Sequence, residues 1–461
     1  MTLIKSISGI RGTIGGKPNE NLTPIDIVES TAAFGSWVSN NFKNEKIKIV
    51  IGRDARISGK MVENLCIGTL QSLGIDVINL GLSTTPTVEI AVPMEKAHGG
   101  IILTASHNPK EWNALKLLNN KGEFISAEDG QLLLEIIKKN DFNFCEVDMI
   151  GKVIEDQTYF NKHIEKILEI NKVDINSIKK AKIKVVLDAV NSTGGMVLPK
   201  LLKALGCSDI IELFCKPNGE FPHNPEPLPE HLTELSKTVV ESGADLGIVV
   251  DPDVDRLAFV CEDGSMFGEE YTLVAVADHV LKNQKGNTVS NLSSTRALRD
   301  VTESHNCEYN ASAVGEVNVV KLMKKTNAII GGEGNGGVIF PELHYGRDAL
   351  IGIALFLSHY AKEGKSMTEL KKSYPNYTIS KNKIQLTPEI NIDNLLGEIS
   401  KKYQNKPQNK IDGLKIELND EWVHLRKSNT EPIIRIYSES SSESKAHQLG
   451  NRFIKEINDL I

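Results

Sequence analysis

The sequence predicts an α/β fold in which three related α/β domains precede a smaller C-terminal α+β domain. Three observations predict it: apolar strands alternate with helical segments, a long segment repeats, and the pattern changes near the C-terminus. Strands that are apolar throughout and alternate with helices are typical of mostly parallel, buried sheets. The length of 461 residues alone predicts about three domains, and the small tail makes a fourth.

The predicted elements alternate along the chain. Each predicted strand is a short apolar run, and each predicted helix carries apolar residues at helical spacing. The strands are expected at residues 47–51, 77–80, 100–103, 185–187 and 246–250. The helices between them are expected to include residues 60–73, 196–205 and 232–241.

A repeat indicates duplicated domains. The run Lys-Ile-Lys-Ile-Val-Ile at 46–51 returns as Lys-Ile-Lys-Val-Val-Leu at 182–187. A turn with Gly and Ser or Thr, a helix and a Gly-led strand follow each run. A fainter third copy begins at 287–289, with a helix over 297–305. Because the copies lie a whole domain apart, they indicate duplication and not a solenoid.

The tail after Tyr374 has a different pattern. It contains short alternating strands, such as 433–438, a joint rich in Gln, Asn and Lys over 404–409, and an amphipathic helix over 443–461. These features predict a small α+β domain. The predicted domains are residues 1–148, 149–256, 257–369 and 370–461.

The composition excludes several classes of protein. With 53 basic and 60 acidic side chains, the net charge is −7, which argues against a broad nucleic-acid surface. No apolar run approaches the roughly 20 residues of a membrane span, and the N-terminus lacks the apolar core of a signal peptide. The six cysteines form no Cys-x-x-Cys pair, so we expect reduced thiols in a cytoplasmic protein.

The segment 104–109, Thr-Ala-Ser-His-Asn-Pro, directly follows a predicted strand. Ser106 is therefore expected where α/β folds place ligands, with His107 beside it and Lys116 ten residues later. The alternative is a solvated serine in a turn. A serine hydrolase is disfavoured because the Gly-x-Ser-x-Gly elbow is absent.

Three carboxylates follow the strand 246–250 at alternate positions: Asp251, Asp253 and Asp255. They would repel one another unless they converged on a divalent cation that prefers oxygen ligands. An EF-hand is excluded because Arg256 stands where its tight turn needs Gly. We expect Mg²⁺ with a phosphate as a further ligand; the alternative is an acidic surface turn.

Two further loops suggest ligand contacts. The loop 331–337 has five Gly, and Glu333 and Asn335 alternate within it, so both could bond sugar hydroxyls. The loop 426–432, with Arg435 beyond it, offers Arg, hydroxyl and amide groups that could hold a phosphate dianion. A Gly-rich turn and a polar hairpin loop are the alternatives.

Two Arg-containing motifs lie near the N-terminus. Residues 8–12 read Ser-Gly-Ile-Arg-Gly, and residues 52–56 read Gly-Arg-Asp-Ala-Arg. Either could supply positive charge to a phosphate, or Arg53 and Asp54 could form an ion pair. A serine, a metal triad, a sugar loop and a phosphate clamp together suggest phosphoryl transfer within a sugar phosphate.

In these motifs and their order the chain resembles the α-D-phosphohexomutases. The motifs are S-G-I-R-G, T-A-S-H-N-P, D-P-D-V-D-R, G-E-x-x-G and R-x-S-N-T-E-P. The resemblance spans essentially the whole chain, and its serine and aspartate motifs are highly specific. It implies three related α/β domains and a smaller fourth domain around a central cleft.

The resemblance also implies a role for each motif. Ser106 would be the phosphorylated serine, and the three aspartates would hold Mg²⁺ with its phosphate. Lys116 would be a general acid or base, with a pKa lowered by Arg11 and burial. The other residues implied to act are His107 and Arg11 beside Lys116, Gly315, Glu333 and Asn335 at the sugar, and Arg426, Ser428, Asn429, Thr430 and Arg435 at a distal phosphate.

The reaction implied is transfer of a phosphoryl group between the 6- and 1-positions of a hexose phosphate, through phosphoserine and a hexose 1,6-bisphosphate intermediate or activator. Asn335 stands where Ser is frequent, Gly337 where His is common, and Ala114 where Gly is common. The loop Gly-Glu-Gly-Asn-Gly-Gly at 332–337 is similar to that of a branch usually assigned as phosphoglucosamine mutases. The resemblance therefore favours glucosamine phosphate, with mannose and glucose phosphates as alternatives. A Mg²⁺-dependent sugar-phosphate phosphatase and a non-catalytic sensor are the other classes. We expect no nucleic-acid or membrane partner, and either a monomer or a homo-oligomer.

Overall fold

The computed structural model describes residues 2–6, 9–386, 391–427 and 433–460. The chain forms two compact units. The first unit comprises Met1–Thr272 and Gly336–Thr368, and the second comprises Leu273–Asn335 and Glu369–Ile461. Within the described residues, no helix is long and apolar enough to cross a membrane.

The first sheet of the first unit is mixed. Its strands lie in the order β1-β2-β6-β5-β3-β4-β7, and β5, β3, β4 and β7 are parallel. The strands are β1 (Ile4–Ser6), β2 (Gly9–Thr13), β3 (Lys48–Arg53), β4 (Asp76–Leu82), β5 (Gly99–Leu103), β6 (Trp112–Leu118) and β7 (Val153–Glu155). The continuous apolar runs predicted for β3, β4 and β5 are therefore confirmed as buried parallel strands.

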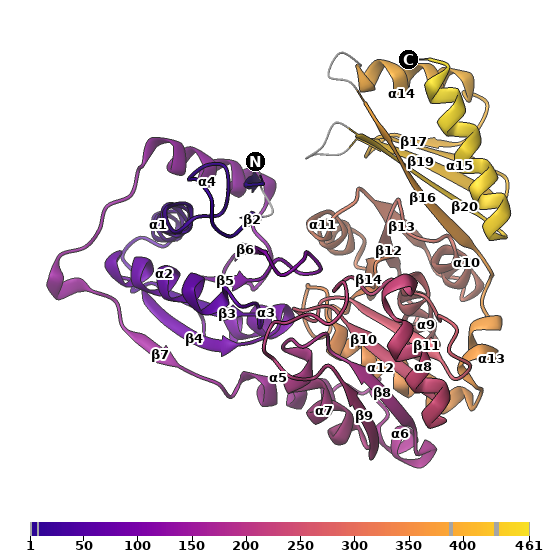
Figure 1. The fold of residues 1–461 in the computed structure, drawn as a ribbon, viewed down its shortest axis with the longest axis horizontal. Coiled ribbons are helices and arrows are strands. Elements are labelled where there is room, and N and C mark those ends of the chain that lie inside the picture. Colours follow the sequence, from indigo (N-terminus) through magenta and orange to yellow (C-terminus); the bar gives the residue numbers. More distant parts are fainter. Residues whose placement is uncertain (1, 7–8, 387–390, 428–432, 461) are drawn as a thin grey trace. The chain divides into compact units, whose positions relative to one another are not determined.

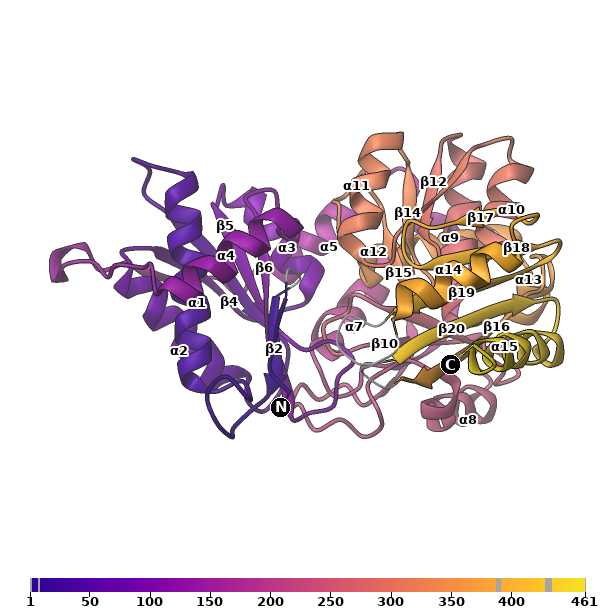
Figure 2. The ribbon, with the colours of Figure 1, turned by 90° about the horizontal axis from the view of Figure 1, so that it is seen from above.

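Helices cover both faces of this sheet (Figures 1 and 2). One apolar core contains side chains of α1 (Pro24–Asn41), α2 (Gly59–Ser72) and α4 (Ala127–Lys139). A second core contains side chains of α3 (Thr85–Met94) and Tyr159 of α5 (Tyr159–Leu168). Burial on both faces explains why these strands are apolar throughout.

The second sheet of the first unit has the order β11-β10-β8-β9. Its strands are β8 (Lys184–Asp188), β9 (Asp209–Leu213), β10 (Leu246–Val250) and β11 (Leu257–Cys261). The helices that belong to this part are α6 (Ile175–Ala181), α7 (Gly194–Leu205), α8 (Thr233–Ser242) and α12 (Ala349–Glu363), and the short strand β15 (Gly337–Ile339) contacts α12. β8, β9 and β10 are parallel, and β11 returns antiparallel to β10.

Two strands lie beyond the domain boundaries predicted from the sequence. β7 pairs with β4, so the first sheet continues past residue 148 to Glu155. β11 pairs with β10, so the second sheet continues past residue 256 to Cys261. The boundaries predicted after residues 148 and 256 thus precede the last strand of each sheet. β7 follows a long loop after α4, whereas β11 follows β10 directly after the aspartate turn.

The second unit begins with α9 (Glu269–Asn283), which crosses the division between the units, and a parallel sheet. The parallel strands are β12 (Thr288–Asn291), β13 (Tyr309–Ser312) and β14 (Ile330–Glu333). Helices α10 (Ala297–Ser304) and α11 (Glu316–Thr326) pack against them. The third copy of the repeat, predicted to begin at 287–289 with a helix over 297–305, is therefore confirmed as β12 and α10.

The C-terminal part of the second unit is an antiparallel sheet in the order β16-β20-β19-β18-β17. After α13 (Met367–Lys372), its elements are β16 (Thr378–Gln385), α14 (Ile392–Lys402), β17 (Gln408–Asn409), β18 (Leu414–Leu418), β19 (Glu421–Lys427), β20 (Ile433–Ser440) and α15 (Glu443–Asn458). In both views α15, in yellow, lies along β16 and β20 (Figures 1 and 2). Helix α14 lies where the sequence predicted only strands and a joint.

A buried lysine joins this sheet to the loop after β12. Lys415 Nζ donates a hydrogen bond to the carbonyl oxygen of Leu292 at 2.9 Å and lies 4.0 Å from the ring centroid of Trp422. Trp422 Nε1 donates in turn to Glu439 Oε1 at 2.6 Å. Burial lowers the pKa of Lys415 to about 8, although Glu417 and Glu439 oppose the shift.

This pKa predicts a pH-dependent stability. The pKa of Lys415 is about 8 in the folded chain against 10.5 ordinarily, so the unfolded chain binds more protons between these pH values. The free energy of unfolding should therefore rise across this window, by about 1 to 3 kcal/mol. Urea unfolding followed by tryptophan fluorescence, at pH 8 and pH 10, measures it. Lys415→Met should remove this rise relative to wild type, whereas Lys410→Met should keep it; an equal rise in all three proteins would contradict the prediction.

Candidate active site

The predicted serine loop follows β5. Ser106 is 7% exposed and has φ of +50°, in the left-handed region that few residues other than Gly adopt. Its hydroxyl donates a hydrogen bond to Asp251 Oδ2 at 2.6 Å. A solvated turn would leave this side chain in water, so the alternative of a solvated serine is wrong.

The three predicted aspartates follow β10 in a tight turn. All three are buried, and one oxygen from each lies within 4.8 Å of the other two. Asp251 Oδ1 accepts hydrogen bonds from the backbone N–H groups of Asp255 and Arg256, at 3.1 Å each. Val254, between Asp253 and Asp255, has φ of +63°, which is strained for a β-branched residue. The turn thus holds three like charges together at a conformational cost.

The donor set fits a divalent cation. Within the described residues, Asp253 Oδ1 and Asp255 Oδ1 are buried and accept no hydrogen bond. Burial, and then the neighbouring carboxylates, raise the pKa of Asp251 well above its ordinary value. Unpaired buried carboxylate oxygens are costly unless a cation lies against them. Hard oxygen ligands favour Mg²⁺ or Ca²⁺ among such cations.

Two basic side chains also contact the triad. Lys116, on β6, places Nζ 2.6 Å from Asp253 Oδ2 and 3.4 Å from Asp255 Oδ2. Arg347 Nη2 lies 2.7 Å from Asp255 Oδ2. Arg347 comes from the loop before α12 and is not among the site residues predicted from the sequence. A single Arg between a strand and a helix gives no signal in one sequence.

The pKa of Lys116 was expected to be lowered, but the structure raises it. Burial lowers the pKa of its ammonium group, as expected, but the carboxylates of Asp253 and Asp255 outweigh burial and raise that pKa above its ordinary value. Lys116 therefore holds its proton in this arrangement. It can donate a proton from Nζ, and it can accept one only when these carboxylates are drawn away.

His107 and Arg11 lie near the same groups. His107 Nδ1 is 3.3 Å from Ser106 Oγ, and burial followed by the charge of Arg256 lowers the pKa of His107 to about 2, so its imidazole is neutral. Arg11 on β2 is paired with Ala114 on β6. Because side chains alternate along a strand, Arg11 and Lys116 project from the same face of the sheet.

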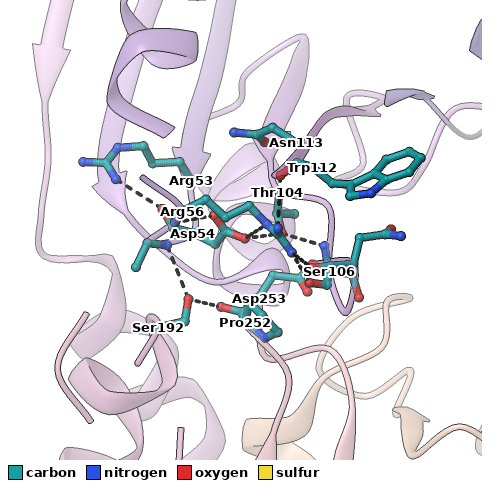
Figure 3. A network of polar contacts seen from close by, with 12 residues as sticks. Arg53, Asp54, Arg56, Thr104, Ser106, Trp112, Asn113, Ser192, Pro252 and Asp253 are labelled. Atoms are coloured by element: carbon teal, nitrogen blue, oxygen red, sulfur yellow. Dashed lines mark hydrogen bonds and ion pairs between the residues drawn. The ribbon is translucent and has the colours of Figure 1, made fainter. Parts of the chain in front are cut away.

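The motif 52–56 does not form the expected ion pair. Arg53 contacts Glu63 at 3.4 Å, whereas Asp54 pairs with Arg56 at 3.0 Å. Figure 3 shows Arg56 turned toward the serine loop. Arg56 is fully buried, so it does not supply charge to a phosphate.

Within the second unit, Glu333 and Gly315, two of the residues predicted to lie at the sugar, contact each other. Glu333, at the end of β14, is 4% exposed, and its Oε1 accepts hydrogen bonds from the backbone N–H of Gly315 at 3.0 Å and from Asn291 Nδ2 at 2.8 Å. Asn335 lies two residues further along the loop. Glu333 therefore holds Gly315 in place, a contact that the sequence pattern did not indicate.

The predicted phosphate clamp is only partly described. Arg426 on β19 is paired in register with Arg435 on β20. Arg426 Nε lies 2.8 Å from Asp412 Oδ2, which also accepts a hydrogen bond from the backbone N–H of Val314 at 2.9 Å. Two Arg residues directly opposite each other favour a bound anion. Ser428, Asn429 and Thr430 lie outside the described residues.

Comparison with known proteins covers most of the chain. Residues 3–144, 161–264 and 268–377 match phosphoglucomutase/phosphomannomutase alpha/beta/alpha domains I, II and III, and residues 388–456 match the C-terminal domain of the same family. The chain belongs to the phosphoglucomutase/phosphomannomutase family. The resemblance to the α-D-phosphohexomutases and the four-domain architecture are thus confirmed, and the enzymes of this family are mutases, a class of isomerases.

Individual relatives match the chain over almost its full length. A Thermococcus kodakarensis protein named phosphoglucomutase/phosphomannomutase is 36% identical, over 96% of this chain and 98% of its own. A Sulfurisphaera tokodaii protein named phosphoglucosamine/phosphogalactosamine mutase is 31% identical, over 97% and 98%. The crystal structure of a phosphoglucomutase/phosphomannomutase family protein from Burkholderia thailandensis has a TM-score of 0.84, at 26% identity over 99% and 97% of the two chains.

Proposed function

We propose that this phosphohexomutase moves a phosphoryl group between the 6- and 1-positions of a hexose phosphate, with Ser106 as the phosphoryl carrier. The observation that carries the proposal is the 2.6 Å hydrogen bond from Ser106 Oγ to Asp251 Oδ2, beside two further buried carboxylates. A serine hydroxyl in contact with a carboxylate triad is suited to accepting and returning a phosphoryl group.

Each transfer breaks one P–O bond and forms another. When phosphorylated Ser106 donates, the P–Oγ bond breaks, a bond forms from phosphorus to a sugar hydroxyl oxygen, and the hydroxyl proton moves to a base. Mg²⁺ held by Asp251, Asp253 and Asp255 would stabilise charge on the transferring group. Lys116 is the proposed proton carrier: its Nζ contacts Asp253 and Asp255, and it would accept the proton once Mg²⁺ draws these carboxylates away.

The sugar must then turn so that its second phosphate reaches Ser106. The bisphosphorylated sugar is the proposed intermediate, and Arg426 and Arg435 are proposed to hold whichever phosphate is not being transferred. Glu333 and Asn335 are proposed to contact the sugar. A fixed clamp that accepts either phosphate supports a mutase over a phosphatase, because hydrolysis needs no second orientation of the substrate.

Glucosamine phosphate is the proposed substrate. The loop sequence Gly-Glu-Gly-Asn-Gly-Gly and the name of the Sulfurisphaera relative support it. The name of the Thermococcus relative favours glucose and mannose phosphates as the alternative. The six cysteines are free thiols, which supports a reducing compartment such as the cytoplasm.

Steady-state kinetics on three substrates would test the choice. We expect kcat/KM for glucosamine 6-phosphate to exceed that for mannose 1-phosphate and glucose 1-phosphate by about tenfold or more, because differences of one polar group in a sugar site commonly have this size. A lower value for glucosamine 6-phosphate would assign the enzyme to the alternative substrates. Release of inorganic phosphate at the isomerisation rate would instead indicate a phosphatase.

A further inference from the structure

The most completely bonded side chain near the serine loop is Arg56, which lies between β3 and α2. Its guanidinium group carries five N–H bonds in one plane. Nε donates to Asp54 Oδ2 at 3.0 Å. The other four N–H bonds donate, at 2.5 to 3.0 Å, to the backbone carbonyl oxygens of Ser106, Asn108, Pro109 and Trp112. All five N–H groups of Arg56 therefore have an acceptor (Figure 3).

Arg56 supplies donors to the serine loop. Residues 106–109 form no sheet ladder or helix, Ser106 is buried and Asn108 is half-buried, and a buried carbonyl group without a partner destabilises the fold. Ser106 itself is held at a positive φ, a strained conformation that the surrounding bonds must maintain. Four bonds from one rigid group fix the direction of these carbonyl groups, and so fix the path of the loop.

Asp54 also holds the backbone N–H of Ser106, through Thr104. Asp54 Oδ2 accepts a hydrogen bond from Thr104 Oγ1 at 2.6 Å, and Thr104 Oγ1 accepts one from the backbone N–H of Ser106 at 2.9 Å. The N–H and the C=O of Ser106 are thus both tied to the Asp54–Arg56 pair. Rotation of the Ser106 backbone would break one of these bonds.

Residues 54–56 are also linked to the turn at 251–255 that carries the three aspartates. The backbone N–H of Ala55 donates to Ser192 Oγ at 3.3 Å, and Ser192 Oγ donates to the carbonyl oxygen of Pro252 at 2.6 Å. Residues 54–56 therefore contact both the serine loop and the turn that carries the aspartates (Figure 3). Their position sets the separation of Ser106 from Asp251.

Arg56 is closed to ligands. Its side chain is fully buried, its charge is balanced by Asp54, and the ring of Phe221 lies 5.1 Å from its Cζ atom. A guanidinium group in these surroundings has no N–H left for a phosphate. Its contribution to the reaction must pass through the backbone that it holds.

We propose that Asp54 and Arg56 form a positioning clamp that sets Ser106 Oγ for phosphoryl transfer. The proposal rests on Ser106 being the phosphoryl carrier. Arg56→Lys keeps the charge beside Asp54, but an ammonium group has three N–H bonds and cannot serve four carbonyl groups and a carboxylate. Misplacement of a reacting atom by about 1 Å can slow a reaction about 100-fold.

The test measures the single-turnover rate constant for phosphorylation of Ser106 by glucose 1,6-bisphosphate, with intact mass as the readout. A rate constant does not depend on the fraction of folded protein, whereas the amplitude does, so a merely structural role would change only the amplitude. We expect Arg56→Lys to lower the rate constant about 100-fold. Arg452→Lys, a control on α15 where Arg452 pairs with Glu456, should leave it unchanged. An Arg56→Lys rate constant within about threefold of wild type would overturn the proposal.

A second pair of variants decides the matter if Arg56→Lys does not fold. Thr104→Val removes the hydroxyl group that joins Asp54 to Ser106, and Thr104→Ser keeps it. We expect Thr104→Val to be phosphorylated about tenfold more slowly than Thr104→Ser, and equal rate constants would overturn the clamp. If the wild-type protein gains no phosphate on Ser106, the proposed function fails, which is a result distinct from any difference between variants.

Discussion

Replacing Ser106 with alanine should lower the mutase rate by at least about 10⁴-fold, because the proposed phosphoryl carrier is then missing. The side chain is almost entirely buried, and its hydroxyl bonds Asp251. Alanine removes one oxygen atom and leaves the backbone bonds of the loop in place. Conversion of hexose 6-phosphate to hexose 1-phosphate, in the presence of the bisphosphate, measures the rate.

Ser30→Ala is the matched control for this variant. Ser30 is a buried serine of α1, and within the described residues its hydroxyl has no hydrogen-bond partner. Its loss should change neither the rate nor the melting temperature appreciably. Ser106→Ala that keeps more than about one hundredth of the wild-type rate would rule out Ser106 as the obligatory carrier.

The second large effect concerns Asp253. Its Oδ1 is buried and, within the described residues, accepts no hydrogen bond, which makes it an available ligand atom for Mg²⁺. Asp253→Asn removes this charge, and we expect the Mg²⁺-dependent rate to fall by about 10³-fold or more. At one hundred times its Kd, Mg²⁺ should stabilise the wild-type protein by about 2.7 kcal/mol. We therefore expect Mg²⁺ to raise the melting temperature of the wild-type protein and to have little effect on that of Asp253→Asn.

Asp263→Asn supplies the control for the metal experiment. Asp263 is an exposed residue of a turn, where its Oδ1 accepts the backbone N–H of Ser265. This variant should respond to Mg²⁺ as the wild-type protein does. If Asp253→Asn and wild type showed the same Mg²⁺-dependent rise in melting temperature, the triad would not be the Mg²⁺ site.

The sequence predicted the parts of the site that depend on strand ends. Ser106 follows β5 of the first sheet and Asp251 follows β10 of the second, and α/β folds bind ligands beyond the carboxyl ends of such strands. The specific order of the motifs then predicted the family, which the comparisons confirm. These features are local in sequence, so one sequence carries them.

The remaining features depend on contacts between distant residues. Arg347 reaches Asp255 from a loop far along the chain, and Arg56 reaches carbonyl groups that carry no side-chain signal. The direction of the Lys116 pKa shift depends on two competing effects, burial and nearby carboxylates, and only the distances to Asp253 and Asp255 decide which is larger. Pattern and composition do not give such distances.

The most direct test of the central claim is to locate the phosphoryl group during turnover. The protein is incubated with glucose 1,6-bisphosphate, analysed by intact mass and peptide mapping, and then mixed with hexose monophosphate. We predict a gain of one phosphoryl group on Ser106 and its transfer to the monophosphate without release of inorganic phosphate. A phosphoryl group on another residue, or one that leaves only as inorganic phosphate, would contradict the account.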